Sequence, residues 1–150
     1  DKFGRADEAI NFYTSVFFFF SGGDNSAVNV MHHYPTETAF SCKVLFADFN
    51  LNQYNMTAMD GPGDHAYTFN EAVSFVVDCD TQEEIDYYWN KLGEGGVYNQ
   101  CGWLDDKFGV SWQIVPTILG QLMADPEKGP RVVQAFLKMT KFDIEALLNA

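Results

Sequence analysis

Apolar residues recur at intervals of three and four along two stretches of the chain, which predicts two amphipathic helices. The first stretch covers residues 6–20 and ends in a run of phenylalanines, which we expect to pass the end of the helix. The second covers residues 80–96, where Asp80 or Thr81 can cap the helix and Gly93 can end it. The sequence therefore predicts one helix in each half of the chain.

Two short apolar runs in the first half, residues 40–49 and 54–60, predict β-strands. They meet at Asn52-Gln53 with little sequence between them, so an antiparallel hairpin is expected, although this pair lacks the glycine that most favours a two-residue turn. A loop rich in turn-forming residues, 61–71, then divides the chain near its middle.

The second half shows a similar order of elements. A strand over residues 72–79 precedes the second helix, strands over 97–105 and 110–116 follow it, and the pattern from Pro116 onward is helical. A helix followed by hairpin strands thus occurs twice, and the first occurrence lacks a leading strand, which is absent or trimmed. The predicted class is α+β, with helices on one face of antiparallel strands.

The repeated pattern also predicts the domain organisation. Residues 1–60 form a first module, residues 61–116 a second module and residues 117–150 a group of C-terminal helices. A chain of 150 residues is long enough for one compact core. We therefore expect one structural domain overall.

The charge of the chain limits its partners. The net charge is −12 and the nine basic residues are scattered, which opposes binding to nucleic acid. No apolar run is long enough for a membrane span, and the first residues do not resemble an export signal. Cys42, Cys79 and Cys101 fit no zinc or disulfide spacing, so free thiols in a reducing cytoplasm are expected.

Several segments together resemble the PhnB-like, or demethylubiquinone-methyltransferase-like, branch of the vicinal-oxygen-chelate superfamily, which includes glyoxalase I, extradiol dioxygenases and the bleomycin-resistance proteins. The segments are RADEAINFYTSVF, HAYTF, VSFVVDCDTQEEIDYYWNKL, CGWLDDKFGVSWQIVP and the tail DPEKGPRVVQAFLKMTKFDIEALL. The resemblance implies paired βαβββ modules whose curved sheets form a cleft, and often a homodimer. The helical tail either crosses the second subunit or packs on its own domain.

The methyltransferase part of the family label finds little support in the residues. A typical adenosylmethionine site needs a glycine-rich turn between a strand and a helix of a parallel α/β sheet. The glycine pairs and clusters of this chain lie in loops or at helix ends, such as residues 22–23 and 93–96. We therefore expect no cofactor.

The resemblance also implies where a metal site would lie. Metal-dependent relatives carry a glutamate four residues after the turn glycine, where this chain has Gln113, and a histidine on the first strand of the module, where it has Val73 or Ser74. A neutral amide adds no negative charge to offset a divalent cation. We therefore expect no metal site of the superfamily type.

Gln113 is instead interpreted as a hydrogen-bonding group on the floor of the cleft, or as a polar residue that bonds neighbouring backbone. If Gln113 faces the cleft, alternation along the strand places Ser111 and Val115 there too, with Trp112 and Ile114 toward the helices. These positions on one strand supply the first candidate ligand contacts.

Four further residues are candidate ligand contacts. Trp103 can stack on a planar ligand or simply pack, and Ser74 lies on the first strand of the second module. His65 can bind a ligand or transfer a proton, or be structural, and Tyr67 can shape the mouth of the cleft beside it.

The remaining polar residues have structural interpretations. Asp105 and Asp106 are expected to cap the turn, and Cys101 has no base nearby in sequence to activate it. His32 and His33 would point to opposite faces of a strand and so cannot chelate one ion together.

The leading functional hypothesis is a cytoplasmic, dimeric PhnB-like protein that binds a small organic molecule in an apolar cleft without a tightly held metal. The rival is a lyase, isomerase or transferase of the superfamily, with His65, Gln113 or a residue of the partner subunit in the active site. The catalytic residues of such an enzyme are unknown. A third possibility is a dimerisation module whose cleft is filled by side chains.

Overall fold

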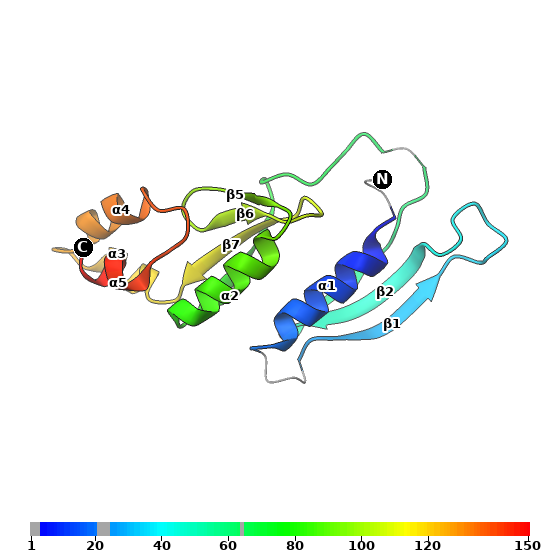
Figure 1. Ribbon diagram of the computed structural model, residues 1–150, viewed down its shortest axis with the longest axis horizontal. Coiled ribbons are helices and arrows are strands. Elements are labelled where there is room, and N and C mark those ends of the chain that lie inside the picture. The colour runs from blue at the N-terminus through cyan, green and yellow to red at the C-terminus, as the bar shows by residue number, and fades with distance from the viewer. Residues whose placement is uncertain (1–3, 21–24, 64) are drawn as a thin grey trace. The chain divides into compact units, whose positions relative to one another are not determined.

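The computed structural model describes residues 4–20, 25–63 and 65–150, and these form two compact units (Figure 1). Unit 1 spans Asp1–Ala66 and unit 2 spans Tyr67–Ala150. Each unit has a sheet of its own with a helix packed on it. Within the described residues no helix is long and apolar enough to cross a membrane.

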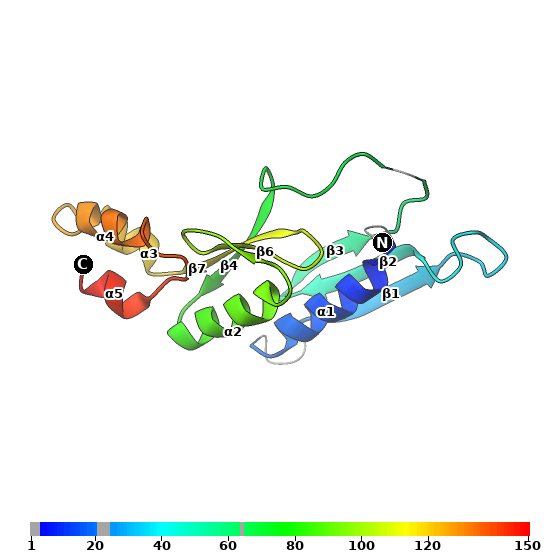
Figure 2. The same cartoon turned by 45° about the horizontal axis from the view of Figure 1, so that its top comes forward.

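Unit 1 consists of one helix on a three-stranded antiparallel sheet. The helix α1 (Ala6–Phe18) is followed by β1 (Ala27–His33), β2 (Val44–Leu51) and β3 (Tyr54–Ala58), in the sheet order β1-β2-β3. Helix α1 lies along the sheet (Figure 2), and its apolar stripe forms the core with β2. The buried apolar residues are Ile10, Tyr13, Val16, Phe17, Val44, Ala47, Phe49 and Leu51.

The hairpin predicted in the first half is present. Strands β2 and β3 pair antiparallel up to Leu51 and Tyr54, with Asn52 and Gln53 as the turn. Both turn residues are left-handed, with φ of 47° and 75°. Asparagine tolerates this conformation better than most residues, so the turn forms without glycine.

Strand β1 is the element that the sequence pattern does not reveal. Its residues are almost all exposed, so no alternation of polar and apolar positions marks it. Its register with β2 also shifts twice, between Val28 and Val30 and between His32 and His33. Irregular edge strands of this kind lack the period of two on which strand prediction depends.

Unit 2 has a four-stranded sheet in the order β4-β7-β6-β5, with one helix packed on it. The elements are β4 (Ser74–Cys79), α2 (Gln82–Gly93), β5 (Val97–Tyr98), β6 (Trp103–Asp105) and β7 (Ser111–Pro116). One pair differs from the expected antiparallel arrangement, because β4 and β7 run parallel. The helix α2 makes the crossover, and a strand that follows such a connection can return beside β4 in the same direction.

Helix α2 begins and ends as its sequence predicts. Of the two possible caps it uses Thr81, whose hydroxyl accepts from the Glu84 backbone N–H while the Glu84 carboxylate accepts from the Thr81 N–H. This reciprocal pair satisfies two backbone donors that the first turn would otherwise leave open. Gly93 is the last residue of the helix.

The strand predicted over residues 97–105 is divided into β5 and β6 by a bend. Cys101 and Gly102 both have left-handed backbones, with φ of 58° and 79°. The bend lets Gly102 donate its N–H to Thr140 O at 2.8 Å and accept from Ile114 N at 2.8 Å. It therefore joins the sheet to the C-terminal part of the chain.

The C-terminal helices pack on unit 2 itself. They are α3 (Leu119–Ala124), α4 (Gly129–Phe136) and α5 (Ile144–Leu148), and they gather at one end of the sheet, beyond β7 (Figure 1). Phe142, Leu147 and Val132 are at most 2% exposed and form their shared core.

Polar contacts from α2 hold this tail in place. The Gln82 side chain donates to Phe142 O at 3.0 Å and accepts from Ile144 N at 2.9 Å. Lys141 forms an ion pair with Asp86, which lies on α2 as Gln82 does. The hydrogen bond from Lys141 is the main reason that the pKa of Asp86 is lowered. The tail thus packs on its own unit, and the predicted alternative of a contact with a second subunit stays a prediction.

Candidate functional site

The two faces of the unit 2 sheet have different surroundings. Helix α2 covers one face, where Trp112 and Ile114 of β7 are 3% and 0% exposed (Figure 2). The side chains that alternate with them lie on the other face, which we call the open face. It consists of Ser74, Val76, Asp78, Val97, Trp103, Asp105, Ser111, Gln113 and Val115.

The alternation along β7 is therefore as the sequence predicts. On the open face, Val76 and Val97 remain 54% and 57% exposed. Tyr98, the neighbour of Val97, faces the other way and stacks on Trp89 of α2, with the ring centroids 4.9 Å apart. Apolar side chains thus remain accessible on a sheet face that also carries hydrogen-bonding groups.

Gln113 occupies the centre of the open face. The strand register places Val76 on one side of it and Trp103 on the other. Its Nε2 donates to Ser74 Oγ at 2.9 Å. Within the described part of the chain no donor reaches its Oε1, so the amide is oriented by one hydrogen bond and keeps its carbonyl oxygen for another group.

A second row of polar residues lies one step along the strands. The register places Ser74, Ser111 and Asp105 side by side. Ser111 Oγ donates to Asp105 Oδ1 at 2.6 Å, and Asn99 Nδ2 donates to Asp105 Oδ2 at 3.0 Å. The Asp105 carboxylate is thus held in place through both of its oxygens.

The two adjacent carboxylates have separate roles. Asp106, not Asp105, caps the turn, because its Oδ1 accepts from Phe108 N at 2.8 Å and Val110 N at 3.1 Å. Its Oδ2 accepts from Trp112 Nε1 at 2.8 Å on the helix-covered side. Asp105 points to the open face instead, where the strand register places it beside Ser111.

Four of the predicted ligand contacts therefore come together on one sheet face: Gln113, Trp103, Ser74 and Ser111. Trp103 is half-buried, and Ser111 is only 1% exposed. Because so little of Ser111 is accessible, its observed part is to orient Asp105. The direct contacts available to a ligand are those of Gln113, Trp103 and Ser74.

The other two predicted contacts, His65 and Tyr67, belong to the loop ahead of β4. His65 is in unit 1, where its imidazole lies near Gly61: a Cβ built on that glycine would be 3.1 Å from the His65 Nε2. Tyr67 is the first residue of unit 2 and is 71% exposed. Their roles at a ligand site stay predictions.

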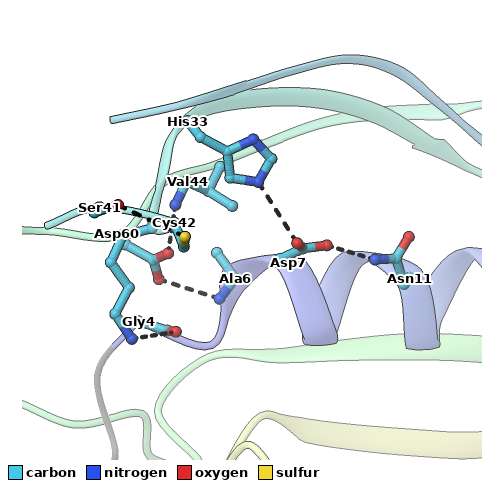
Figure 3. Close-up of polar contacts among 10 residues, drawn as sticks. Gly4, Ala6, Asp7, Asn11, His33, Ser41, Cys42, Val44 and Asp60 are labelled. Carbon is cyan, nitrogen blue, oxygen red and sulfur yellow. Dashed lines mark hydrogen bonds and ion pairs between the residues drawn. The ribbon is translucent and has the colours of Figure 1, made fainter. Parts of the chain in front are cut away.

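The histidines of β1 lie on opposite sides of the unit 1 sheet. His33 reaches the helix side, where its Nε2 is 3.5 Å from Asp7 Oδ2 of α1 (Figure 3). His32 pairs with Phe46, which alternates with the buried Ala47 and so faces away from α1. The two imidazoles therefore do not form a common metal site.

Figure 3 also shows how the start of α1 is held. Asp60 is 8% exposed; its Oδ1 accepts from Ala6 N at 3.1 Å and its Oδ2 accepts from Val44 N at 2.8 Å. This carboxylate ties the first turn of the helix to β2. Asp60 and Asp106 thus play similar structural parts in the two units.

The pair of Gln113 and Ser74 does not fit a divalent cation. Both side chains are neutral, and they are bonded to each other. Across residues 4–20, 25–63 and 65–150, no three His, Cys, Asp or Glu side chains group as a metal site would require.

The buried Cys79 and the half-buried Cys101 are not set up as nucleophiles. Burial raises the pKa of Cys79 to about 12, with smaller contributions from nearby carboxylates such as Glu84. The thiol of Cys101 donates to Phe136 O at 3.7 Å. The Cys79 thiol therefore remains protonated, which makes it a poor nucleophile.

Sequence reasoning missed four members of the open face: Val76, Asp78, Val97 and Asp105. Val76 and Asp78 follow Ser74 at intervals of two, so alternation from the predicted contact on β4 would have found them. Asp105 was assigned to the turn because it precedes a second aspartate, and only the register with Ser111 separates the two.

The chain is similar to a known protein family and to solved structures. The model of a family described as 3-demethylubiquinone-9 3-methyltransferase matches residues 2–115. A solved PhnB protein of Bacillus cereus, whose name includes the same methyltransferase activity, is 35% identical. The chain belongs to the PhnB-like family. The match covers 76% of this chain and 92% of the Bacillus protein, with a TM-score of 0.69.

A second solved structure shares the fold. The protein PA1353 of Pseudomonas aeruginosa is 20% identical, with 75% of this chain and 90% of that one covered and a TM-score of 0.61. A comparison with functionally curated proteins finds no match. The predicted PhnB-like membership and α+β class are thus confirmed, and the residues that the structure describes form five helices and two sheets.

Proposed function

We propose that this PhnB-like protein binds a small organic molecule on the open face of unit 2 and does so without a tightly held metal. The observation that carries the proposal is the hydrogen bonding of the Gln113 side-chain amide. Its amide is oriented by Ser74 and presents a carbonyl oxygen between the apolar surfaces of Val76 and Trp103. A few placed polar groups among apolar ones are typical of small-molecule sites.

Each of these residues has a separate part in the proposed site. Trp103 supplies a flat aromatic surface for a planar ligand, and Val76 adds apolar area that is still exposed. Gln113 accepts one hydrogen bond from the ligand at Oε1, while its Nε2 donates to Ser74 Oγ. The ligand would therefore be partly apolar and carry at least one hydrogen-bond donor.

A thermal-shift screen with polyaromatic antibiotics, quinones and small carbonyl compounds tests the binding. At least one compound should raise the unfolding midpoint in a saturable way. Gln113→Ala should weaken that compound by about tenfold, the effect of losing one hydrogen bond. Trp103→Ala should weaken it at least as much, because the stacking surface is lost.

Gln121→Ala is the matched control, because Gln121 is an exposed glutamine on α3. This variant should bind as the unchanged protein does. Equal affinity in the Gln113, Trp103 and Gln121 variants would remove the open face as the site, even if a ligand were found.

Metal analysis tests the second part of the proposal. Protein purified without chelator should contain far less than one divalent ion per chain, because neutral amide and hydroxyl donors hold such ions weakly. The measurement is elemental analysis after extensive dialysis. One retained ion per chain, lost in Gln113→Ala, would contradict the metal-free assignment.

The rival proposal is an enzyme, and the methyltransferase name of the family and of the Bacillus relative favours it. The chain gives methyl transfer little support, because the link from β4 to α2 is Asp80-Thr81 and contains no glycine-rich turn. Turnover of a compound found in the screen would favour a lyase, isomerase or transferase.

Four further properties stay predictions: membership of the vicinal-oxygen-chelate superfamily, a cleft between paired modules, a homodimer and a cytoplasmic location.

A further inference from the structure

We propose that the open face prefers an aromatic molecule with a positively charged group and disfavours anionic ligands. This inference rests on the proposed function and specifies the chemistry of the same site. It begins with the charges of the four strands of unit 2. Strands β4 to β7 contain two charged side chains, Asp78 and Asp105, and both lie on the open face.

Asp105 is the better placed of the two. It is half-buried, whereas Asp78 is exposed and lies on the edge strand β4. Hydrogen bonds from Ser111 and Asn99 hold both carboxylate oxygens in place without neutralising the charge. A fixed and partly desolvated carboxylate attracts a cation more strongly than a mobile surface carboxylate does.

The spacing of the site residues describes the ligand. Trp103 and Asp105 are alternate residues of β6, so their side chains stand about 7 Å apart on the same face. Gln113 lies on the neighbouring strand, directly beside Trp103. A ring on the indole can therefore place a donor near Gln113 Oε1 and an ammonium group one short linker away, near Asp105.

The indole adds to the preference. The face of a tryptophan ring attracts cations, with energies that grow as water is excluded. The strands offer no lysine, arginine or histidine on this face to pair with an anion. The chain as a whole carries a net charge of −12, which also attracts cations and repels anions over longer distances.

Three probes that share one ring test the preference: 2-naphthylmethylammonium, 2-naphthalenemethanol and 2-naphthoate. Isothermal titration calorimetry with the unchanged protein should give the tightest binding for the ammonium compound, about tenfold tighter than the alcohol. The carboxylate should bind more weakly than the alcohol. The advantage of the ammonium compound should shrink as the salt concentration rises.

Asp105→Asn should remove most of that advantage, because it keeps the size of the side chain and removes its charge. Glu83→Gln is the control, since it removes one charge from the exposed side of α2. It should leave the ratio between the ammonium compound and the alcohol unchanged. If Asp105→Asn fails to fold, the order of the three probes and its salt dependence in the unchanged protein decide the question.

The outcomes separate this inference from the proposed function. Binding of the alcohol that depends on Gln113 and Trp103, with no preference for the ammonium compound, would overturn the inference and leave the binding site in place. Equal loss in Asp105→Asn and Glu83→Gln would also overturn it. If no probe and no screened compound binds, both proposals are wrong.

Discussion

Replacing Gly102 by alanine should lower the free energy of unfolding by about 3 kcal/mol. Part of this loss is the strain of placing a side chain on a left-handed backbone, and the rest is the overpacking caused by the added Cβ. Gly102 has φ of 79°, which L-residues with a side chain rarely adopt. A Cβ at this position would be 2.5 Å from the Phe142 ring and 2.6 Å from Ile114 O. Urea unfolding followed by circular dichroism measures the loss.

Gly109 provides a matched control for this substitution. It also has a left-handed backbone, with φ of 86°, but nothing lies within 4 Å of an added Cβ. Gly109→Ala should therefore cost only the backbone part, about 1 kcal/mol. Equal losses in the two variants would show that the contact with Phe142 and Ile114 does not restrict position 102.

Removing the Asp106 carboxylate should also destabilise the protein strongly. Asp106→Ala should lower the free energy of unfolding by about 3 kcal/mol, because a buried charged acceptor with several donors is lost and the donors remain buried. Asp106 is 4% exposed and accepts from Phe108 N, Val110 N and Trp112 Nε1. Urea unfolding followed by tryptophan fluorescence measures the change.

Two further variants make this result specific. Asp106→Asn keeps one oxygen that can accept from the turn, so it should cost less than Asp106→Ala. Asp125 accepts from Glu127 N and Lys128 N in a similar turn but is fully exposed. Asp125→Ala should have a much smaller effect, since water can replace the lost acceptor. A comparable loss at both positions would contradict the role assigned to burial.

The elements that sequence predicts well are those whose local signals agree. Helix α2 has an apolar stripe, a capping box of Thr81 and Glu84 and a final Gly93, and its bounds follow from these residues. The hairpin at Asn52-Gln53 also follows from two apolar runs with little sequence between them. In both cases neighbouring residues determine the structure.

The elements that were missed depend on distant parts of the chain. Strand β1 is exposed and irregular, and it forms by pairing with β2. The parallel pairing of β4 with β7 depends on where α2 returns the chain, which no local pattern encodes. The bend at Cys101 and Gly102 is likewise set by contacts with the tail.

The candidate site was predictable in part for the same reason. Alternation along β7 is local, and it gives the facing of Gln113 and Ser111. The hydrogen bond between Gln113 and Ser74 and the position of Asp105 depend on strand register, which joins residues far apart in the sequence. The sequence therefore predicts which residues face the site more readily than it predicts the hydrogen bonds between them.

The parallel pairing of β4 with β7 has a consequence for synthesis on the ribosome. The β2–β3 hairpin can close as soon as its residues emerge, because its contacts are local. Strand β4 must wait for α2, β5, β6 and β7, and meanwhile it displays Val77 and Cys79, which are only 8% and 0% exposed in the folded protein. During that interval nascent chains are most vulnerable to sticking to one another, so slowed translation between β4 and β7 should increase their dependence on chaperones.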